Sequence, residues 1–118
     1  MPSTPFKSAE SALSDIADNL RLALEFVAGL DFAAFCDDRR TVYAVTRCFE
    51  IVSEASRRLP EDLKVKHPEI PWRDIAGAGN IYRHDYEDVA EQLLWRTLQD
   101  GLHPLLAVVD GELRILRT

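Results

Sequence analysis

Apolar residues in the first quarter of the chain recur every three or four positions, which is the spacing of an amphipathic helix. The pattern runs from residue 8 to residue 30, with Ser8 as a candidate N-cap and Gly29 as a candidate stop. The segment 31–38 follows with Asp31 as a cap and an apolar face, so we expect about two helical turns there. Residues 1–7 show no such pattern and are expected to fray.

A second long helix is predicted from about residue 39 to residue 59. Either Asp37 or Asp38 can cap its start, and Pro60 ends it. Its charged residues occupy the other faces of the helix, as expected for a surface that contacts water on one side. The apolar stripe consists of Val42, Val45, Phe49, Val52, Ala55 and Leu59.

The acidic residues of this helix have two interpretations. Glu54 and Arg58 stand one turn apart, in the order that favours an ion pair on a solvent-facing surface. Alternatively, Glu50 and Glu54 form a carboxylate pair that faces a site. The sequence leaves both interpretations open.

Pro68 and Pro71 divide the next segment. Residues 61–72, EDLKVKHPEIPW, are expected to be loop-like, with at most one helical turn before the prolines. Pro71 suits the first turn of a helix that runs to residue 84, because its missing N–H is not needed there. Gly77 and Gly79 each weaken this helix by up to about 1 kcal/mol relative to alanine. Their presence indicates that another helix or a second subunit approaches the backbone closely.

The last third of the chain has a further helical stripe. The chain can restart with Asp85 as an N-cap, and Gly101 and Pro104 are expected to bend or break the helix. Beyond residue 104 the pattern is ambiguous, because an Asp-Gly pair lies between apolar runs as in a hairpin while the apolar spacing also continues a helix. We favour a helix that gives way to a frayed or irregular end over residues 111–118.

These elements predict an all-α protein, an antiparallel bundle of about four to five helices in which residues 1–118 form a single domain. The chain has 118 residues, of which 47% are apolar, and is long enough to bury a core. No window reaches the roughly 18 apolar residues of a membrane span, and the start lacks the apolar centre of a signal peptide. We therefore expect a cytoplasmic protein that does not contact membranes.

The charge of the chain is unevenly distributed. The net charge is −6, which argues against general affinity for nucleic acids, because phosphate neutralisation by lysine and arginine supplies most of that affinity. Residues 39–83, however, hold 9 basic and 6 acidic residues, a net charge of +3 that leaves −9 for the remainder. The middle of the chain is therefore suited to meet a phosphate, although solvated helix faces explain the same charges.

The cysteines and histidines do not suggest a metal site. Cys36 and Cys48 are twelve residues apart among apolar neighbours, and we expect both to be buried thiols without a disulfide. His67, His84 and His103 have no cysteine or glutamate at ligand spacing. Neither a metal nor a cofactor is expected.

A polar cluster lies within the stretch GAGNIYRHDY, residues 77–86. Asn80 and His84 are four residues apart and therefore share one helix face, and Tyr86 follows just past the expected helix end. An imidazole can take a proton from a ribose 2′-hydroxyl or give one to a leaving oxygen near neutral pH. A histidine at a helix end is also common as a cap or a packing residue, and the cluster alone leaves this alternative open.

The run IPWRDIAGAGNIYRHDYEDVAEQLLWRTLQDGLHPLL places this cluster in a longer ordered pattern. It resembles the signature of the HepT-like toxins of the HEPN superfamily, which read Pro-Trp, then R-N-x-x-x-H-x-Y, then Val-Trp and a leucine-proline turn. Upstream, Ser53-Glu54-Ala55 stands where that family has glycine-glutamate-alanine. The resemblance spans residues 10–108. The matching residues are Pro71, Trp72, Asn80, His84, Tyr86, Trp95, Leu102, Pro104 and Leu105.

The resemblance implies an all-helical bundle that forms a homodimer and cuts RNA, such as tRNA or mRNA, without a metal at a composite site on the dimer interface. His84 would be the acid or base, and Asn80 a phosphate or orienting contact. Such toxins are paired with a nucleotidyltransferase antitoxin that can attach AMP to the tyrosine of the motif, here Tyr86.

One position departs from the family pattern. The arginine of the motif stands where this chain has Gly79, and a glycine cannot bind a phosphate as a guanidinium does. Arg83 is a candidate replacement, although it lies next to His84 and therefore points about 100° round the helix. The alternative is a catalytically silenced binding module that dimerises and docks a nucleotidyltransferase, and a third reading is a purely structural helical dimer.

Overall fold

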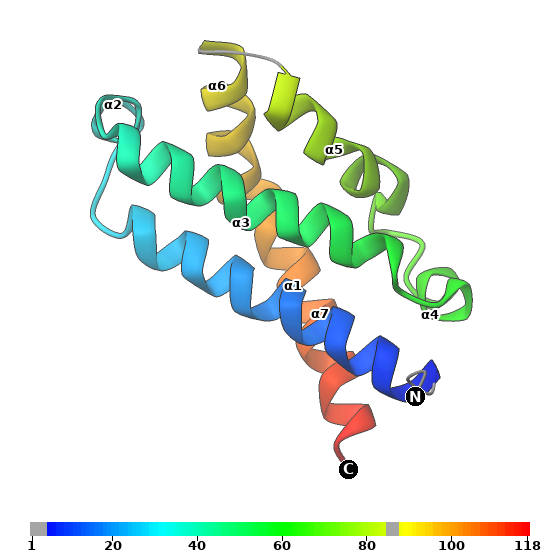
Figure 1. The fold of residues 1–118 in the computed structure, drawn as a ribbon. Coiled ribbons are helices and arrows are strands. Elements are labelled where there is room, and N and C mark those ends of the chain that lie inside the picture. Colours follow the sequence, from blue (N-terminus) through cyan, green and yellow to red (C-terminus); the bar gives the residue numbers. More distant parts are fainter. Residues whose placement is uncertain (1–4, 85–87) are drawn as a thin grey trace.

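The computed structural model describes the backbone of residues 5–84 and 88–118 and the side chains of residues 9–79 and 90–118. Every element in these residues is a helix, which confirms the all-α class (Figure 1). We expected about four to five helices, and the described residues form four long helical units and two short helices, α2 and α4. The elements are α1 (Pro5–Val27), α2 (Phe32–Asp37), α3 (Arg39–Arg57), α4 (Glu61–Lys66), α5 (Trp72–His84), α6 (Asp88–Arg96), the π-helical turn η1 (Thr97–Gly101) and α7 (Leu102–Leu116).

Two aspartates begin the second and third helices, as expected. The Asp31 carboxylate accepts a hydrogen bond from the backbone N–H of Ala34 at 2.8 Å. Asp38 accepts hydrogen bonds from the hydroxyl and the N–H of Thr41 at 2.7 and 3.3 Å, and these bonds lower the pKa of its carboxyl. Each cap satisfies a backbone donor that the first turn of a helix leaves free.

The first helix ends as predicted but begins earlier. It stops at Val27, and Gly29 adopts φ = 81°, a conformation that residues with a side chain rarely adopt. The prediction that residues 1–7 fray and that Ser8 caps the helix is wrong for residues 5–7, which form the first turn of α1. Pro5 suits that position because its fixed φ matches a helix and its missing N–H would have no partner. Residues 1–4 lie outside the described residues.

The long helices pack in an antiparallel arrangement. α1 and α3 lie side by side, joined through α2, and α7 passes behind α1 in the view of Figure 1, so that the first turns of α1 and the end of α7 lie near each other. Arg117 near the C-terminus binds Glu10 at 3.2 Å, while Arg21 binds Asp110 further along the same pair of helices. These two ion pairs establish that α7 runs antiparallel to α1.

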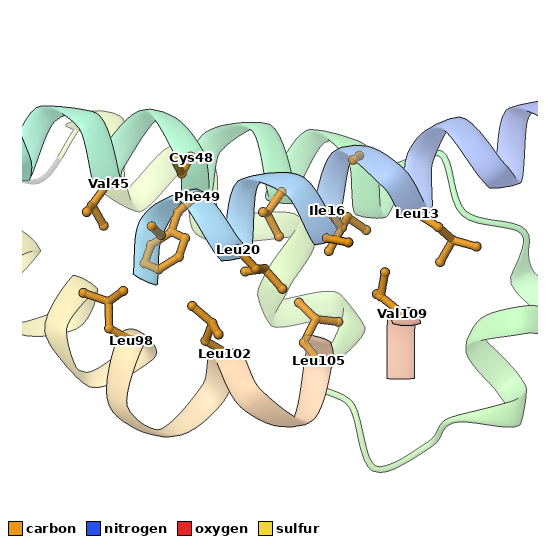
Figure 2. Packing of buried hydrophobic residues seen from close by; sticks show 14 of the residues in the cluster. Leu13, Ile16, Leu20, Val45, Cys48, Phe49, Leu98, Leu102, Leu105 and Val109 are labelled. Carbon is orange, nitrogen blue, oxygen red and sulfur yellow. The ribbon is translucent and has the colours of Figure 1, made fainter. Parts of the chain in front are cut away.

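The core forms where α1, α3 and the C-terminal helices meet (Figure 2). The stripes read from the sequence are the buried faces of α1 and α3, which confirms the helical interpretation of both segments. Truncating any one of these aliphatic side chains to alanine typically costs about 2–5 kcal/mol. The core includes Leu13, Ile16, Leu20, Val45, Cys48, Phe49, Leu98, Leu102, Leu105 and Val109.

The C-terminal third is helical to Leu116, so the expected frayed or irregular end at 111–118 is wrong for residues 111–116. Val109 and Leu113 are buried against the core, and this burial outweighs the local turn signal of the Asp-Gly pair. Of the predicted bend or break at Gly101 and Pro104, the break does not occur, because the helix continues through the π-helical turn, where the N–H of Leu102 donates to the carbonyl of Thr97. Such a turn accommodates Pro104, whose ring would otherwise press on the carbonyl four residues earlier.

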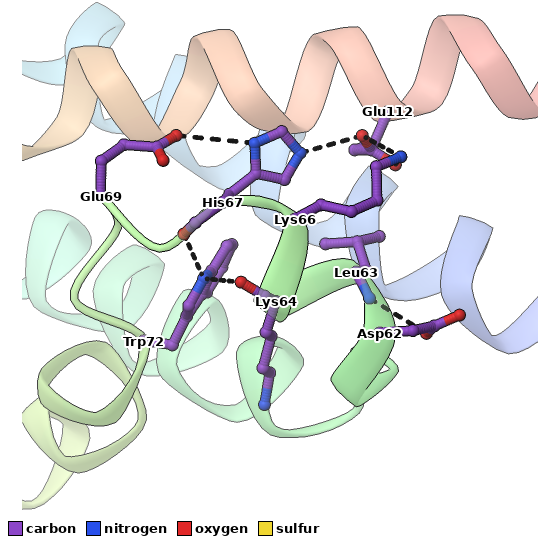
Figure 3. Close-up of polar contacts among 8 residues, drawn as sticks. All are labelled: Asp62, Leu63, Lys64, Lys66, His67, Glu69, Trp72 and Glu112. Atoms are coloured by element: carbon purple, nitrogen blue, oxygen red, sulfur yellow. Dashed lines mark hydrogen bonds and ion pairs between the residues drawn. The ribbon is translucent and has the colours of Figure 1, made fainter.

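The segment expected to be a loop contains α4, and polar contacts hold it to Trp72 and to Glu112 on α7 (Figure 3). The Trp72 indole N–H donates to the carbonyls of Lys64 and His67 at 3.1 and 3.0 Å. His67 Nε2 lies 2.9 Å from Glu112 Oε2 on α7, and Lys66 Nζ lies 3.1 Å from the same oxygen. These contacts anchor α4 on α7.

The Glu112 carboxylate is buried, with 8% of the residue exposed. Burial raises its pKa, but hydrogen bonds and charges from His67 and Lys66 outweigh burial and hold the pKa below its ordinary value of 4.5. A carboxyl group whose pKa is lowered by folding stabilises the folded protein at pH values above its unfolded pKa, and this contribution is lost as the pH falls through the folded pKa.

We therefore expect Glu112→Gln to lower the free energy of unfolding by about 1–3 kcal/mol at neutral pH. The difference from the wild type should shrink as the pH falls below 4.5, because the wild-type carboxylate is then protonated as well. Urea unfolding followed by circular dichroism across this pH range measures the difference. Glu69→Gln is the matched control, since Glu69 lies 3.5 Å from His67 Nδ1 with an exposed side chain. A difference that stays constant with pH would contradict the assignment.

In the part of the chain that the structure describes, no helix is long and apolar enough to cross a membrane.

Candidate functional site

Asn80, Arg83 and His84 lie in the last two turns of α5. The backbone of Asn80, Arg83 and His84 is helical, so Asn80 and His84 follow each other at one-turn spacing as predicted. Their side chains lie outside the described residues, as do Tyr86 and the expected N-cap Asp85. The chemical roles predicted for these side chains stay predictions.

α5 packs tightly against α3 at Gly79. The N–H of Gly79 donates to Ser53 Oγ at 3.2 Å, and the Ser53 hydroxyl donates to the carbonyl of Ala76 at 2.9 Å. A Cβ atom at position 79 would lie 3.1 Å from Ser53 Oγ and 3.3 Å from Ser53 Cβ. The expected close approach of another helix is therefore confirmed at Gly79, whereas a Cβ at Gly77 would meet nothing within 4 Å.

The two glycines are expected to respond differently to alanine. Gly77→Ala should raise the free energy of unfolding by about 0.5–1 kcal/mol, because alanine has the higher helix propensity and its Cβ lies in open space. Gly79→Ala gains the same propensity but forces Ser53 to move, so we expect no net stabilisation or a loss. Thermal and urea unfolding of both variants measures this difference. Equal stabilisation by the two substitutions would contradict the tight contact.

An arginine of α3 occupies the space beside Gly79. Arg57 donates from Nε and Nη2 to the carbonyl of Ala76 at 3.1 and 2.8 Å, and Nη2 lies 3.5 Å from Ser53 Oγ. The same Nη2 lies 3.9 Å from the position of a Cβ at Gly79. A guanidinium group therefore stands next to the position from which the motif arginine is missing. Sequence reasoning missed it, and the available signal was its one-turn spacing from Ser53.

The other charged residues considered from the sequence are placed differently. Arg58 binds Asp15 of α1 at 2.6 Å, and the part of the chain that the structure describes contains no ion pair between Arg58 and Glu54. Glu50 is half-buried and Glu54 is exposed on α3. Their interpretation as a carboxylate pair stays a hypothesis.

A cleft of about 350 Å³ lies between α5, α3 and the C-terminal helices. Its lining is mostly apolar and includes Val52, Ile75, Ala78, Leu93 and Leu102. Among the described residues that line it, none is a lysine or an arginine. The cleft is therefore chemically unsuited to a phosphate, unlike the contact around Gly79.

The cysteines form no disulfide with each other. Cys48 is buried as predicted, and burial raises the pKa of its thiol, whereas Cys36 is only half-buried. Within the described ranges, no group of three or more histidine, cysteine, aspartate or glutamate side chains is arranged to hold a metal ion.

Comparisons with known proteins agree with the resemblance carried by the motif. The sequence model of the family described as ribonuclease HepT-like matches residues 16–111. A Thermococcus cleftensis protein named "Probable ribonuclease HepT" is 38% identical over 99 residues, which cover 84% of this chain and 90% of that protein. The Methanocaldococcus jannaschii protein named "Putative RNase MJ1380" is 32% identical over 104 residues, 88% of this chain and 95% of that protein. No solved structure gives a significant match. The chain belongs to the ribonuclease HepT-like family.

Proposed function

We propose that this protein is the toxin of a toxin–antitoxin pair and cleaves RNA without a metal ion. The observation that carries the proposal is the family match over residues 16–111, which encloses the ordered motif at the C-terminal end of α5. His84 is the general acid–base residue of this site. It removes the proton from a ribose 2′-hydroxyl, whose oxygen attacks the adjacent phosphorus, and the bond from phosphorus to the 5′-oxygen breaks as that oxygen takes a proton from water. The products are a 2′,3′-cyclic phosphate and a 5′-hydroxyl.

The neighbouring residues of the motif assist this reaction. Asn80, one turn before His84, orients the imidazole or contacts the phosphate. Arg83 is a candidate phosphate ligand, as expected from the sequence. The protein acts as a homodimer whose two sites face each other, and a nucleotidyltransferase antitoxin silences it by attaching AMP to Tyr86. The net charge of +3 over residues 39–83 supports contact with RNA in an otherwise acidic protein.

A second candidate function is a silenced binding module that dimerises and docks a nucleotidyltransferase. Gly79 favours this candidate, because position 79 carries no guanidinium to stabilise the charge that develops on the phosphate. The asparagine, histidine and tyrosine stand in the sequence at the spacing of the family motif, which favours the nuclease, since a pure docking surface does not require these residues at that spacing.

Induced expression in a bacterial host separates the two candidates. The nuclease proposal predicts growth arrest by the wild type, and growth restored by His84→Ala or by co-expression of a cognate nucleotidyltransferase. His103→Ala is the matched control, because His103 is exposed on α7 and should leave the arrest unchanged. Normal growth with the wild type at a verified expression level would reject the toxin and favour the binding module.

A further inference from the structure

We propose that Arg57 of α3 binds the scissile phosphate and takes the place of the guanidinium that position 79 does not carry. The inference rests on the proposed function, because it assigns a substrate-binding residue to the site around His84. Three observations carry it: the contacts of the Arg57 side chain, its position beside Gly79, and the antiparallel register of α3 and α5.

The Arg57 guanidinium is held in place by neutral oxygens. Nε and Nη2 both donate to the carbonyl of Ala76, and Nη2 lies 3.5 Å from Ser53 Oγ. In the described part of the chain, no carboxylate lies within ion-pair distance of it. Hydrogen bonds therefore hold the guanidinium in one orientation, and no carboxylate of the described residues neutralises its positive charge. These are the properties expected of a group that binds an anionic ligand. The arginines that the structure pairs with carboxylates are Arg21 with Asp110, Arg58 with Asp15 and Arg117 with Glu10.

The guanidinium keeps donors for a ligand. An arginine side chain has five N–H groups, and the contacts to Ala76 and Ser53 involve only those on Nε and Nη2. Among the described residues, none accepts a hydrogen bond from Nη1. The residue is exposed, so a phosphate can reach these donors from solvent. Two adjacent N–H groups of a guanidinium match two oxygens of a phosphate, which a lysine cannot reproduce.

The register of the helices brings Arg57 to the correct side of α5. Ser53 contacts Gly79 and Arg57 contacts Ala76, so α3 and α5 run antiparallel. The backbone positions of Ala76, Asn80 and His84 follow one another at four-residue intervals on one face of α5. Arg57 donates to the carbonyl of Ala76, the first residue of this row. The Nη2 atom of Arg57 also lies 3.9 Å from the position of a Cβ at Gly79, and the five steps from Gly79 to His84 rise by about 7.5 Å along the helix axis, a span that one phosphodiester with its flanking riboses can bridge.

Gly79 leaves the space that this arrangement needs. A Cβ at position 79 would lie 3.1 Å from Ser53 Oγ, and the Arg57 Nη2 lies 3.9 Å from the same point. A longer side chain there would compete with the guanidinium and displace the serine that contacts it. The missing side chain of Gly79 on α5 therefore leaves the space that the Arg57 side chain on α3 occupies.

A purely structural role would use the same hydrogen bonds, with Arg57 serving only to fasten α3 to α5. That reading predicts lower stability of Arg57→Ala without a specific loss of RNA binding. The test must therefore measure RNA affinity and stability separately.

The experiment compares the wild type with Arg57→Ala, Arg57→Lys, Arg58→Ala and Arg83→Ala. For each protein we measure the rate of cleavage of a labelled RNA, the Kd for a 2′-deoxy analogue that cannot be cleaved, and thermal stability.

Arg57→Ala should lower the cleavage rate by about 10²–10³-fold, by analogy with the loss of one donor to a transition-state oxyanion. Its Kd should rise by about tenfold, and its salt dependence should fall by about one phosphate contact. Arg57→Lys should recover binding more than rate, and added guanidinium chloride at millimolar concentration should partly rescue Arg57→Ala.

Arg58→Ala is the matched control. Arg58 is the next residue on α3 and is bound to Asp15, so its removal should change neither the rate nor the Kd by more than about twofold. If Arg57→Ala does not fold, Arg57→Lys takes its place in each comparison.

A further variant moves the guanidinium from α3 to position 79 on α5 and tests for a gain of function. Ser53→Gly removes the two atoms that lie 3.1 and 3.3 Å from a Cβ at position 79, so Gly79→Arg can then be accommodated. The triple variant with Ser53→Gly, Arg57→Ala and Gly79→Arg should cleave RNA at least about tenfold faster than Arg57→Ala alone.

The outcomes separate this inference from the proposed function. Cleavage by the wild type with equal rates and Kd values for Arg57→Ala and Arg58→Ala would overturn the role of Arg57 and leave the nuclease in place. A loss of activity in Arg83→Ala but not in Arg57→Ala would do the same. If the wild type does not cleave RNA, the proposed function fails, and only the Kd for the 2′-deoxy analogue then tests whether Arg57 binds a phosphate. A rise in Kd confined to Arg57→Ala then supports a phosphate site, and an unchanged Kd overturns it.

Discussion

Replacing His84 with alanine is expected to lower the rate constant of RNA cleavage by about 10²–10⁴-fold, the range that general acid–base catalysis contributes. In the proposed mechanism the imidazole accepts the proton of the attacking 2′-hydroxyl, so without it water must accept that proton at a far lower rate. Single-turnover cleavage of a labelled RNA, with enzyme in excess, measures this step without interference from product release.

His103→Ala controls for the loss of an imidazole as such. His103 is exposed on α7, and we expect its removal to leave the rate constant unchanged. Both variants should keep the helical circular dichroism spectrum and the unfolding midpoint of the wild type. A rate constant for His84→Ala within about twofold of the wild type would exclude His84 as the acid–base residue.

Replacing Phe35 with alanine is expected to lower the free energy of unfolding by about 3–5 kcal/mol. Phe35 is fully buried, and its ring centroid lies 5.3 Å from that of Trp95. The ring joins α2 to α6, so its removal leaves a cavity and also loosens the attachment of the connector between α1 and α3 to the C-terminal helices. The expected loss is a large part of the total stability of a protein of this size.

Phe32→Ala is the matched control for this substitution. Phe32 also contacts Trp95, with ring centroids 5.9 Å apart, but it is 36% exposed. We expect a loss of about 1 kcal/mol, because its removal opens less buried space. Urea unfolding at equilibrium compares the two variants, and equal losses would show that Phe35 does not hold the packing assigned to it.

The helical class and the main caps could be predicted because they depend on short-range patterns. The stripes of α1 and α3 coincide with their buried faces, and Asp31 and Asp38 cap α2 and α3. Each of these features involves residues only a few positions apart, where spacing and side-chain chemistry determine the local structure.

The ends of the helices could not be predicted as well, because tertiary contacts outweighed local signals. An Asp-Gly pair is typical of a turn, yet α7 continues through it since Val109 and Leu113 are buried and Glu112 binds His67. Likewise, Pro104 does not end the helix, because the π-helical turn at Thr97–Gly101 precedes it.

The candidate site was predictable only in part. The order of Asn80, His84 and Tyr86 is visible in the sequence, and Gly79 indicated a close approach of helices. Arg57 was not identified, because its proximity to Gly79 depends on the register of α3 against α5, which spacing along the chain does not reveal.

The structure also relates two departures from the family pattern. The resemblance places Ser53 where the family has glycine, and Gly79 where it has arginine. These two residues face each other, and a Cβ at position 79 would lie 3.1 Å from Ser53 Oγ. The side chains at this contact therefore come from α3 rather than α5.

The most direct test of the account is the incubation of the purified wild-type protein with labelled tRNA and mixed RNA in the presence of EDTA. We predict cleavage of the RNA to fragments that end in 2′,3′-cyclic phosphates, and no cleavage where the 2′-hydroxyl at the cut site is replaced by hydrogen. Intact RNA after prolonged incubation with folded protein would contradict the account, and it would leave this family member as a binding protein.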